Sequence, residues 1–115
     1  MKIRSQELVD VDAKLEEARV RAGNYGRLYG RYGVAEDRLK TVYAQLLQDA
    51  PANETVDGKS AWVRRHESYI QAVGEKEVAF AEWKAAEVFM KLLLAEVEVW
   101  RSKEASQRWI DNAHR

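Results

Sequence analysis

The chain has 115 residues, enough for one domain, and it lacks cysteine, which excludes disulfides, thiolate metal sites and cysteine nucleophiles. Its 19 basic and 19 acidic residues cancel, so the bulk charge neither requires nor excludes a nucleic-acid partner. No apolar run approaches the roughly 20 residues of a membrane span, and the first residues contain no signal-peptide core. We therefore expect a cytoplasmic protein with no membrane partner.

The first predicted element is a long helix from about residue 5 to residue 49. Apolar residues follow a heptad pattern from Leu8 to Leu46, which is typical of a helix that packs along one seam. Ser5 is a suitable N-cap, and Pro51 cannot continue the helix.

Four glycines, Gly23, Gly26, Gly30 and Gly33, lie within this helix and share one face. Each costs about 1 kcal/mol relative to alanine in a helix, so we expect a compensating contact. Their spacing would let a neighbouring helix or a ligand approach the backbone closely. The alternative is a loop in this segment, but the tyrosines keep their heptad phase through it, which favours the continuous helix.

Residues 50–58 have the composition of a turn and form the predicted link. A second helix is predicted from about residue 60 to residue 112, and it contains neither proline nor glycine between Glu75 and Ile110. The sequence therefore predicts a single all-α domain, built as a long, coiled-coil-like antiparallel helical hairpin.

Two adjacent apolar stripes follow the second helix, and one partner helix cannot cover so wide an apolar face. We therefore expect further copies of the chain to cover it, in a homo-oligomeric helical bundle or ring. The residues predicted to mediate this oligomerisation are Trp83, Val88, Met90, Leu92, Leu93, Val97, Val99, Trp100 and Trp109.

Charge is segregated along the two predicted helices. Residues 19–40 contain six basic and two acidic residues, a local charge of plus four. Residues 75–100 contain three basic and six acidic residues, a local charge of minus three. Opposite charges on the two segments would let identical chains attract one another.

Catalytic and metal-binding patterns are absent from the sequence. His66 and His114 are the only histidines and lie far apart, and no phosphate-binding glycine loop or nucleophile elbow occurs. We expect no enzymatic activity, no catalytic residues, no cofactor and no metal.

Arginines and tyrosines alternate between Asn24 and Tyr32, and such mixtures bind single-stranded nucleic acid through phosphate neutralisation and base stacking. On a helix the arginines share one face and the tyrosines lie roughly opposite, so the tyrosines either form core or stack on bases. The predicted nucleic-acid-binding residues are Arg19, Arg21, Arg27, Arg31, Arg38, Lys40, Arg64 and Arg65, and the candidates for base stacking are Tyr29, Tyr32 and Tyr69.

The order of these elements, with a second helix that includes Glu75-Lys76-Glu77-Val78 and closes on Trp109-Ile110-Asp111-Asn112, resembles the UvsY-like recombination mediators of bacteriophages. The resemblance covers most of the chain and implies a location in the host cytoplasm. It implies binding of single-stranded DNA and help in loading a RecA-type recombinase onto strands coated by single-strand binding protein. It also implies ring-like homo-oligomers formed through the C-terminal helical part. The chain departs from the family's basic segment at Val42, where the family pattern has an arginine.

A second function fits the same residues. In this alternative the chain is a helical protein–protein interaction module, such as a phage inhibitor of a host complex or a structural coiled coil. Its arginine face would then meet an acidic protein surface rather than DNA. Oligonucleotide binding separates the two functions.

Overall fold

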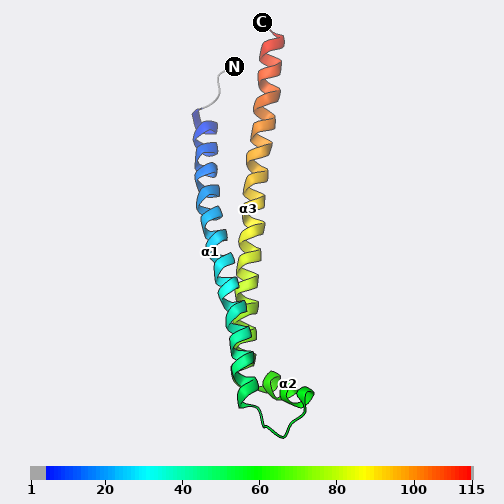
Figure 1. Ribbon diagram of the computed structural model, residues 1–115. Coiled ribbons are helices and arrows are strands. Elements are labelled where there is room, and N and C mark those ends of the chain that lie inside the picture. The colour runs from blue at the N-terminus through cyan, green and yellow to red at the C-terminus, as the bar shows by residue number, and fades with distance from the viewer. Residues whose placement is uncertain (1–4, 115) are drawn as a thin grey trace. The chain divides into compact units, whose positions relative to one another are not determined.

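The computed structural model describes residues 5–114 of the chain, and the side chains of residues 10–114. These residues form three α-helices and no strand: α1 spans Ser5–Asp49, α2 spans Val56–Arg65 and α3 spans Glu67–Ala113 (Figure 1). The prediction of an all-α fold is confirmed. Helices α1 and α3 run antiparallel, which confirms the helical hairpin.

Helix α1 continues through all four of its glycines, so the loop alternative does not apply. Apart from the adjacent residues and the nearby backbone of α1 itself, a Cβ atom placed on Gly23, Gly26, Gly30 or Gly33 would meet no described atom within 4 Å. The close contact that the sequence led us to expect at this face is therefore not made within one chain. The cost of these glycines in α1 is not offset by local packing.

The single second helix expected from about residue 60 is corrected by the structure, which divides this region into α2 and α3 at His66. Helix α2 begins earlier than expected because Thr55 caps it, its hydroxyl accepting a hydrogen bond from the Gly58 N–H at 3.0 Å. His66 has an extended backbone with ψ of 137°, which ends α2. Its ring Nδ1 then accepts a hydrogen bond from the Ser68 N–H at 3.1 Å at the start of α3.

Two compact units share the long helices. The central unit comprises Gly26–Lys84, and the terminal unit comprises the residues up to 25 and from 85 onward. In the central unit, the second part of α1 packs against the first part of α3, with α2 beside them (Figure 1). Its core contains Leu28, Leu46, Ala50, Ala72 and Val63, of which Val63 on α2 is fully enclosed.

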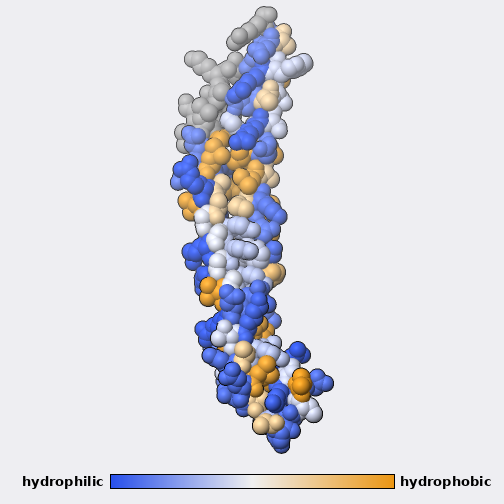
Figure 2. Space-filling model, in the orientation of Figure 1, coloured by the Kyte–Doolittle hydropathy of each residue, from blue (hydrophilic) through white to orange (hydrophobic). Residues whose placement is uncertain are grey.

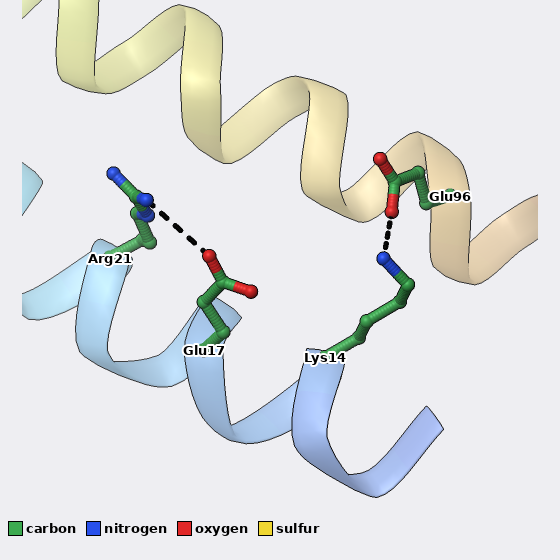
Figure 3. Close-up of polar contacts among 4 residues, drawn as sticks. All are labelled: Lys14, Glu17, Arg21 and Glu96. Atoms are coloured by element: carbon green, nitrogen blue, oxygen red, sulfur yellow. Dashed lines mark hydrogen bonds and ion pairs between the residues drawn. The ribbon is translucent and has the colours of Figure 1, made fainter. Parts of the chain in front are cut away.

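The terminal unit has a narrower core. Val11 and Ala18 of α1 are buried with Ala86, Leu93 and Val97 of α3, at the heptad spacing expected for two packed helices. Lys14 forms an ion pair with Glu96 across the two helices (Figure 3). This contact raises the pKa of Lys14 above its ordinary value of 10.5, chiefly through the hydrogen bond to the Glu96 carboxylate.

Candidate nucleic-acid and assembly surfaces

Two of the arginines expected to bind phosphate are engaged with carboxylates of α3. In the central unit, Arg31 lies 3.7 Å from Glu82, and Arg38 lies 3.5 Å from Glu75. Both arginine side chains stay 60% exposed, so these are solvated surface pairs of the kind that contribute at most about 1 kcal/mol. The pairs nevertheless lower the positive potential that a phosphate backbone would meet at this face.

Other basic residues of α1 pair along the helix itself. Arg19 lies 3.2 Å from Glu16, Arg21 lies 3.4 Å from Glu17 (Figure 3), and Lys40 lies 4.0 Å from a carboxylate oxygen of Glu36. These contacts link residues three or four positions apart, the separation at which helical neighbours face one another. The excess charge of plus four in residues 19–40 is thus partly balanced from within α1 and partly from α3.

The basic residues of α2 differ from those of α1. Arg64 and Arg65 are exposed in its last turn, and neither forms an ion pair with any residue in the described part of the chain. The half-buried rings of Trp62 and His66 lie beside them in sequence, with ring centroids 5.4 Å apart. The end of α2 thus combines two exposed, unneutralised cations with two half-buried aromatic rings close to them in sequence.

Tyr29 and Tyr32 take part in helix packing in the central unit. Their rings contact Trp83 of α3, with centroid distances of 4.8 Å and 5.3 Å, and the Tyr32 and Trp83 rings are stacked with 23° between their planes. Phe80 completes the cluster at 5.6 Å from Tyr32 and 5.9 Å from Trp83. The Tyr32 hydroxyl is hydrogen-bonded to the Glu36 carboxylate, which raises the pKa of Tyr32 above 10.0.

The third candidate for base stacking also has an aromatic neighbour within the chain. Tyr69 lies 6.0 Å from the Tyr43 ring, and the Tyr43 hydroxyl is 3.1 Å from that of Ser60. The interpretation of the tyrosines as packing residues therefore has direct support from these contacts. Tyr29 alone among the three combines a ring contact with an exposed fraction above one half.

The residues predicted to mediate oligomerisation fall into three groups. Leu93 and Val97 belong to the core of the terminal unit, and Trp83 belongs to the aromatic cluster of the central unit. Met90 and Trp100 are half-buried. The remaining four are exposed by more than half: Val88, Leu92, Val99 and Trp109.

An exposed apolar stripe on α3 thus remains in the terminal unit. It consists of Val88, Leu92 and Val99, which share one face of the helix because they are separated by four and seven residues. Hydrophobic side chains, coloured orange in Figure 2, reach the surface of the molecule in several places. Phe89, also exposed and overlaid by the Arg21 guanidinium at 5.5 Å, was not anticipated from the sequence.

A shallow groove of about 930 Å³ lies between α1 and α3 on the central unit, and sequence reasoning missed it. Arg27, Arg31 and Arg38 line it from α1, and Glu75 and Glu82 line it from α3. Small and aliphatic residues lie between these charges. The groove depends on how α1 and α3 align, which no local pattern specifies.

The described residues hold no group of three or more His, Asp or Glu side chains arranged to bind a metal ion. None of the helices, over the residues that are described, has the length and apolar character needed to cross a membrane.

Comparison with known proteins gives no match among family models, curated proteins or solved structures. The resemblance to UvsY-like mediators stays a prediction from the sequence.

Proposed function

We propose that the chain is a non-enzymatic, single-stranded-DNA-binding recombination mediator that assists loading of a RecA-type recombinase. The observation that carries this proposal is the exposed Arg64 and Arg65 pair at the end of α2, where the Trp62 and His66 rings also lie. Unneutralised cations release counterions when they meet phosphates, and adjacent aromatic faces accept bases of any sequence. The resemblance supplies the recombinase and the single-strand binding protein as the proposed partners.

The arginines of α1 would contribute to this function by exchanging partners. Arg31 and Arg38 are bound to carboxylates at 3.5–3.7 Å and are largely exposed, so giving up these pairs for phosphates costs little. The exchange also leaves the Glu75 and Glu82 carboxylates unpaired close to the bound DNA, and their repulsion of the phosphates opposes binding. We therefore expect Arg64 and Arg65 to contribute more affinity than Arg31 and Arg38, although the sequence alone favoured the α1 stripe.

The test is fluorescence anisotropy with a labelled oligothymidine, measured over a range of salt concentrations. Replacement of Arg64 and Arg65 by glutamine should weaken binding and lower the slope of log affinity against log salt by about 0.7 for each phosphate that is no longer neutralised. The matched control replaces Arg101 and Arg108, which are exposed and paired with Glu98 and Glu104 on α3.

The outcomes separate the alternatives. An unchanged salt slope in the Arg64 and Arg65 variant, with weaker binding in the Arg101 and Arg108 control, would move the DNA site to the terminal unit. No binding of the oligonucleotide by the parent protein would refute the DNA function. A positive result leads to a second assay, in which the protein should speed recombinase assembly on strands coated by single-strand binding protein.

A second candidate function is a helical protein–protein interaction module, which the exposed apolar stripe of Val88, Leu92 and Val99 favours. Water-exposed apolar stripes of this kind mark interaction sites, and further copies of the chain are the partner we propose for it. Leu92→Lys should disperse an oligomer formed by this stripe while the chain stays folded, because the Leu92 side chain is not part of the core.

The neighbouring position provides the control. Leu93 is only 8% exposed within the chain, so Leu93→Lys should instead unfold the terminal unit and lower its helicity. Circular dichroism and light-scattering mass distinguish these effects. A parent protein with the mass of one chain at all accessible concentrations would refute self-association through the stripe and leave only a different protein as partner.

A further inference from the structure

The groove on the central unit presents backbone and small apolar groups to solvent. Val34 on α1 is 70% exposed and Val78 on α3 is 59% exposed, although both are aliphatic. Gly30 and Gly74 lie in the same groove, and a Cβ atom on either would meet nothing within 4 Å in the described chain. Without side chains at these two positions, another helix can approach the backbone closely.

The two edges of this groove carry opposite charges. Arg27, Arg31 and Arg38 form the α1 edge, and Glu75 and Glu82 form the α3 edge. The groove is therefore apolar in the middle, positive along one side and negative along the other. A surface with this pattern is complementary to itself when it is turned so that each edge meets the opposite edge.

We propose that the groove is filled by the same surface of a second copy of the chain. The two copies are related by a two-fold axis parallel to the helices, and the central-unit part of α1 in each copy lies antiparallel over α3 of the other. The α1 and α3 segments of each copy then supply two of the four helices of a bundle. This interface shares no residue with the apolar stripe of the terminal unit, and it depends on neither candidate function.

The direction of the axis follows from the ion pairs within one chain. Arg31 is level with Glu82, and Arg38 is level with Glu75, along the helix direction. A two-fold rotation about an axis parallel to the helices keeps each residue's position along that axis and places α1 of one copy over α3 of the other. Arg31 of one copy therefore lies at the same position along the axis as Glu82 of the other. A two-fold axis perpendicular to the helices would instead place arginines against arginines, which is unfavourable.

The same register brings the exposed aliphatic residues together. Val34 of one copy comes level with Ala79, adjacent to Val78, in the other copy, because the paired positions follow the Arg31–Glu82 alignment. The arrangement covers both exposed valines and the glycine backbone in one contact. Two isolated surface pairs in each chain become part of a larger charge network, the setting in which such pairs have a measurable effect.

Disulfide formation tests the arrangement directly, because the chain has no cysteine of its own. Val34→Cys and Val78→Cys variants are prepared separately, mixed and oxidised. We expect the mixture to form linked dimers several-fold faster than either variant alone, because residues whose Cα atoms are more than about 7 Å apart cannot be bridged. Faster linking of Val34→Cys to itself, or no linked dimer in the mixture, would overturn the proposal.

Charge reversal provides an independent test in solution. Arg31→Glu with Arg38→Glu leaves Arg27 as the one basic residue on edges that are otherwise acidic, and Glu75→Arg with Glu82→Arg gives an all-basic pair of edges. Each variant alone should lose association through the groove, and mixing the two should restore it. The mixture repairs contacts between chains but leaves the like charges within each chain, so rescue identifies the contact as intermolecular.

The control for charge reversal is Arg64→Glu with Arg65→Glu, which makes the same change in net charge away from the groove. Mass should be measured by analytical ultracentrifugation, and helicity by circular dichroism should stay at the parent level in all variants. Failure of the mixed variants to associate, with helicity retained, would overturn the proposal. Equal dissociation of the Arg64→Glu and Arg65→Glu control would also overturn the proposal, because it would show that the change in net charge alone weakens association.

Discussion

The exposed glycines of α1 lead to a prediction about stability that opposes the usual view of glycines in a helical seam. Gly26 and Gly33 lie within α1 and do not line the groove, and a Cβ atom on either would meet nothing within 4 Å. Gly26→Ala combined with Gly33→Ala should therefore stabilise the chain. Alanine loses less backbone entropy on folding than glycine and introduces no clash.

The size of the effect follows from helix propensity. Each replacement in a helix interior is worth about 0.5–1 kcal/mol, so the double variant should gain about 1–2 kcal/mol. For a domain of this size, 1 kcal/mol moves the melting temperature by roughly 4 °C, and the expected rise is about 4–8 °C. The gain should not depend on protein concentration if both positions face solvent in the assembled protein as well.

The measurement is thermal denaturation by circular dichroism at a low and a high protein concentration. Gly30→Leu serves as the contrast, because Gly30 lines the groove. It should raise the melting temperature at low concentration, where chains are separate, and weaken association at high concentration by overpacking. An unchanged or lowered melting temperature in the Gly26 and Gly33 double variant would refute the reasoning, because it would show that these faces are already occupied.

Three further predictions concern the described contacts. Trp83→Ala should destabilise the central unit by about 3 kcal/mol in urea denaturation, because it removes the centre of the aromatic cluster, whereas Trp83→Phe should cost less. Thr55→Ala should cost about 1 kcal/mol of α2 stability through loss of its 3.0 Å cap, and trypsin should cleave about fivefold faster after Arg65; an unchanged cleavage rate would count against the cap. Partners raise the pKa values of both Lys14 and Tyr32, so the folded state binds these protons more tightly than the unfolded state does. Their contribution should be complete below about pH 10 and be lost as the pH rises further, which an alkaline titration of helicity checks; Lys14→Met should remove part of that loss.

The helices were predictable because their pattern is local. Heptad spacing and the stop signal at Pro51 predicted a first helix to about residue 49, and the structure has α1 ending at Asp49. The division at His66 was missed because no glycine or proline marks it. At His66 the backbone leaves the helical conformation, and the His66 side chain caps the start of α3. Separately, the Thr55 cap starts α2 earlier than the sequence pattern predicted.

The candidate site was less accessible to sequence reasoning because it depends on how two distant segments align. The positive and negative segments were visible as charges, and mutual attraction was expected between separate chains. The structure uses the same attraction within one chain, where Arg31 meets Glu82 and Arg38 meets Glu75. That register arises between segments far apart in the sequence, so local periodicity could not specify which arginines remain unneutralised.

The narrowness of the two cores has a consequence for the way the protein opens. Each unit buries only a few side chains, so each helical turn depends mainly on the contacts nearest to it. Amide hydrogen exchange should therefore be graded along the helices instead of uniform. Within the central unit the slowest amides should surround Val63, whose side chain is wholly enclosed. Within the terminal unit protection should peak near Val97 and decline toward the end of α3, so the opening of single helical turns would precede loss of the whole unit.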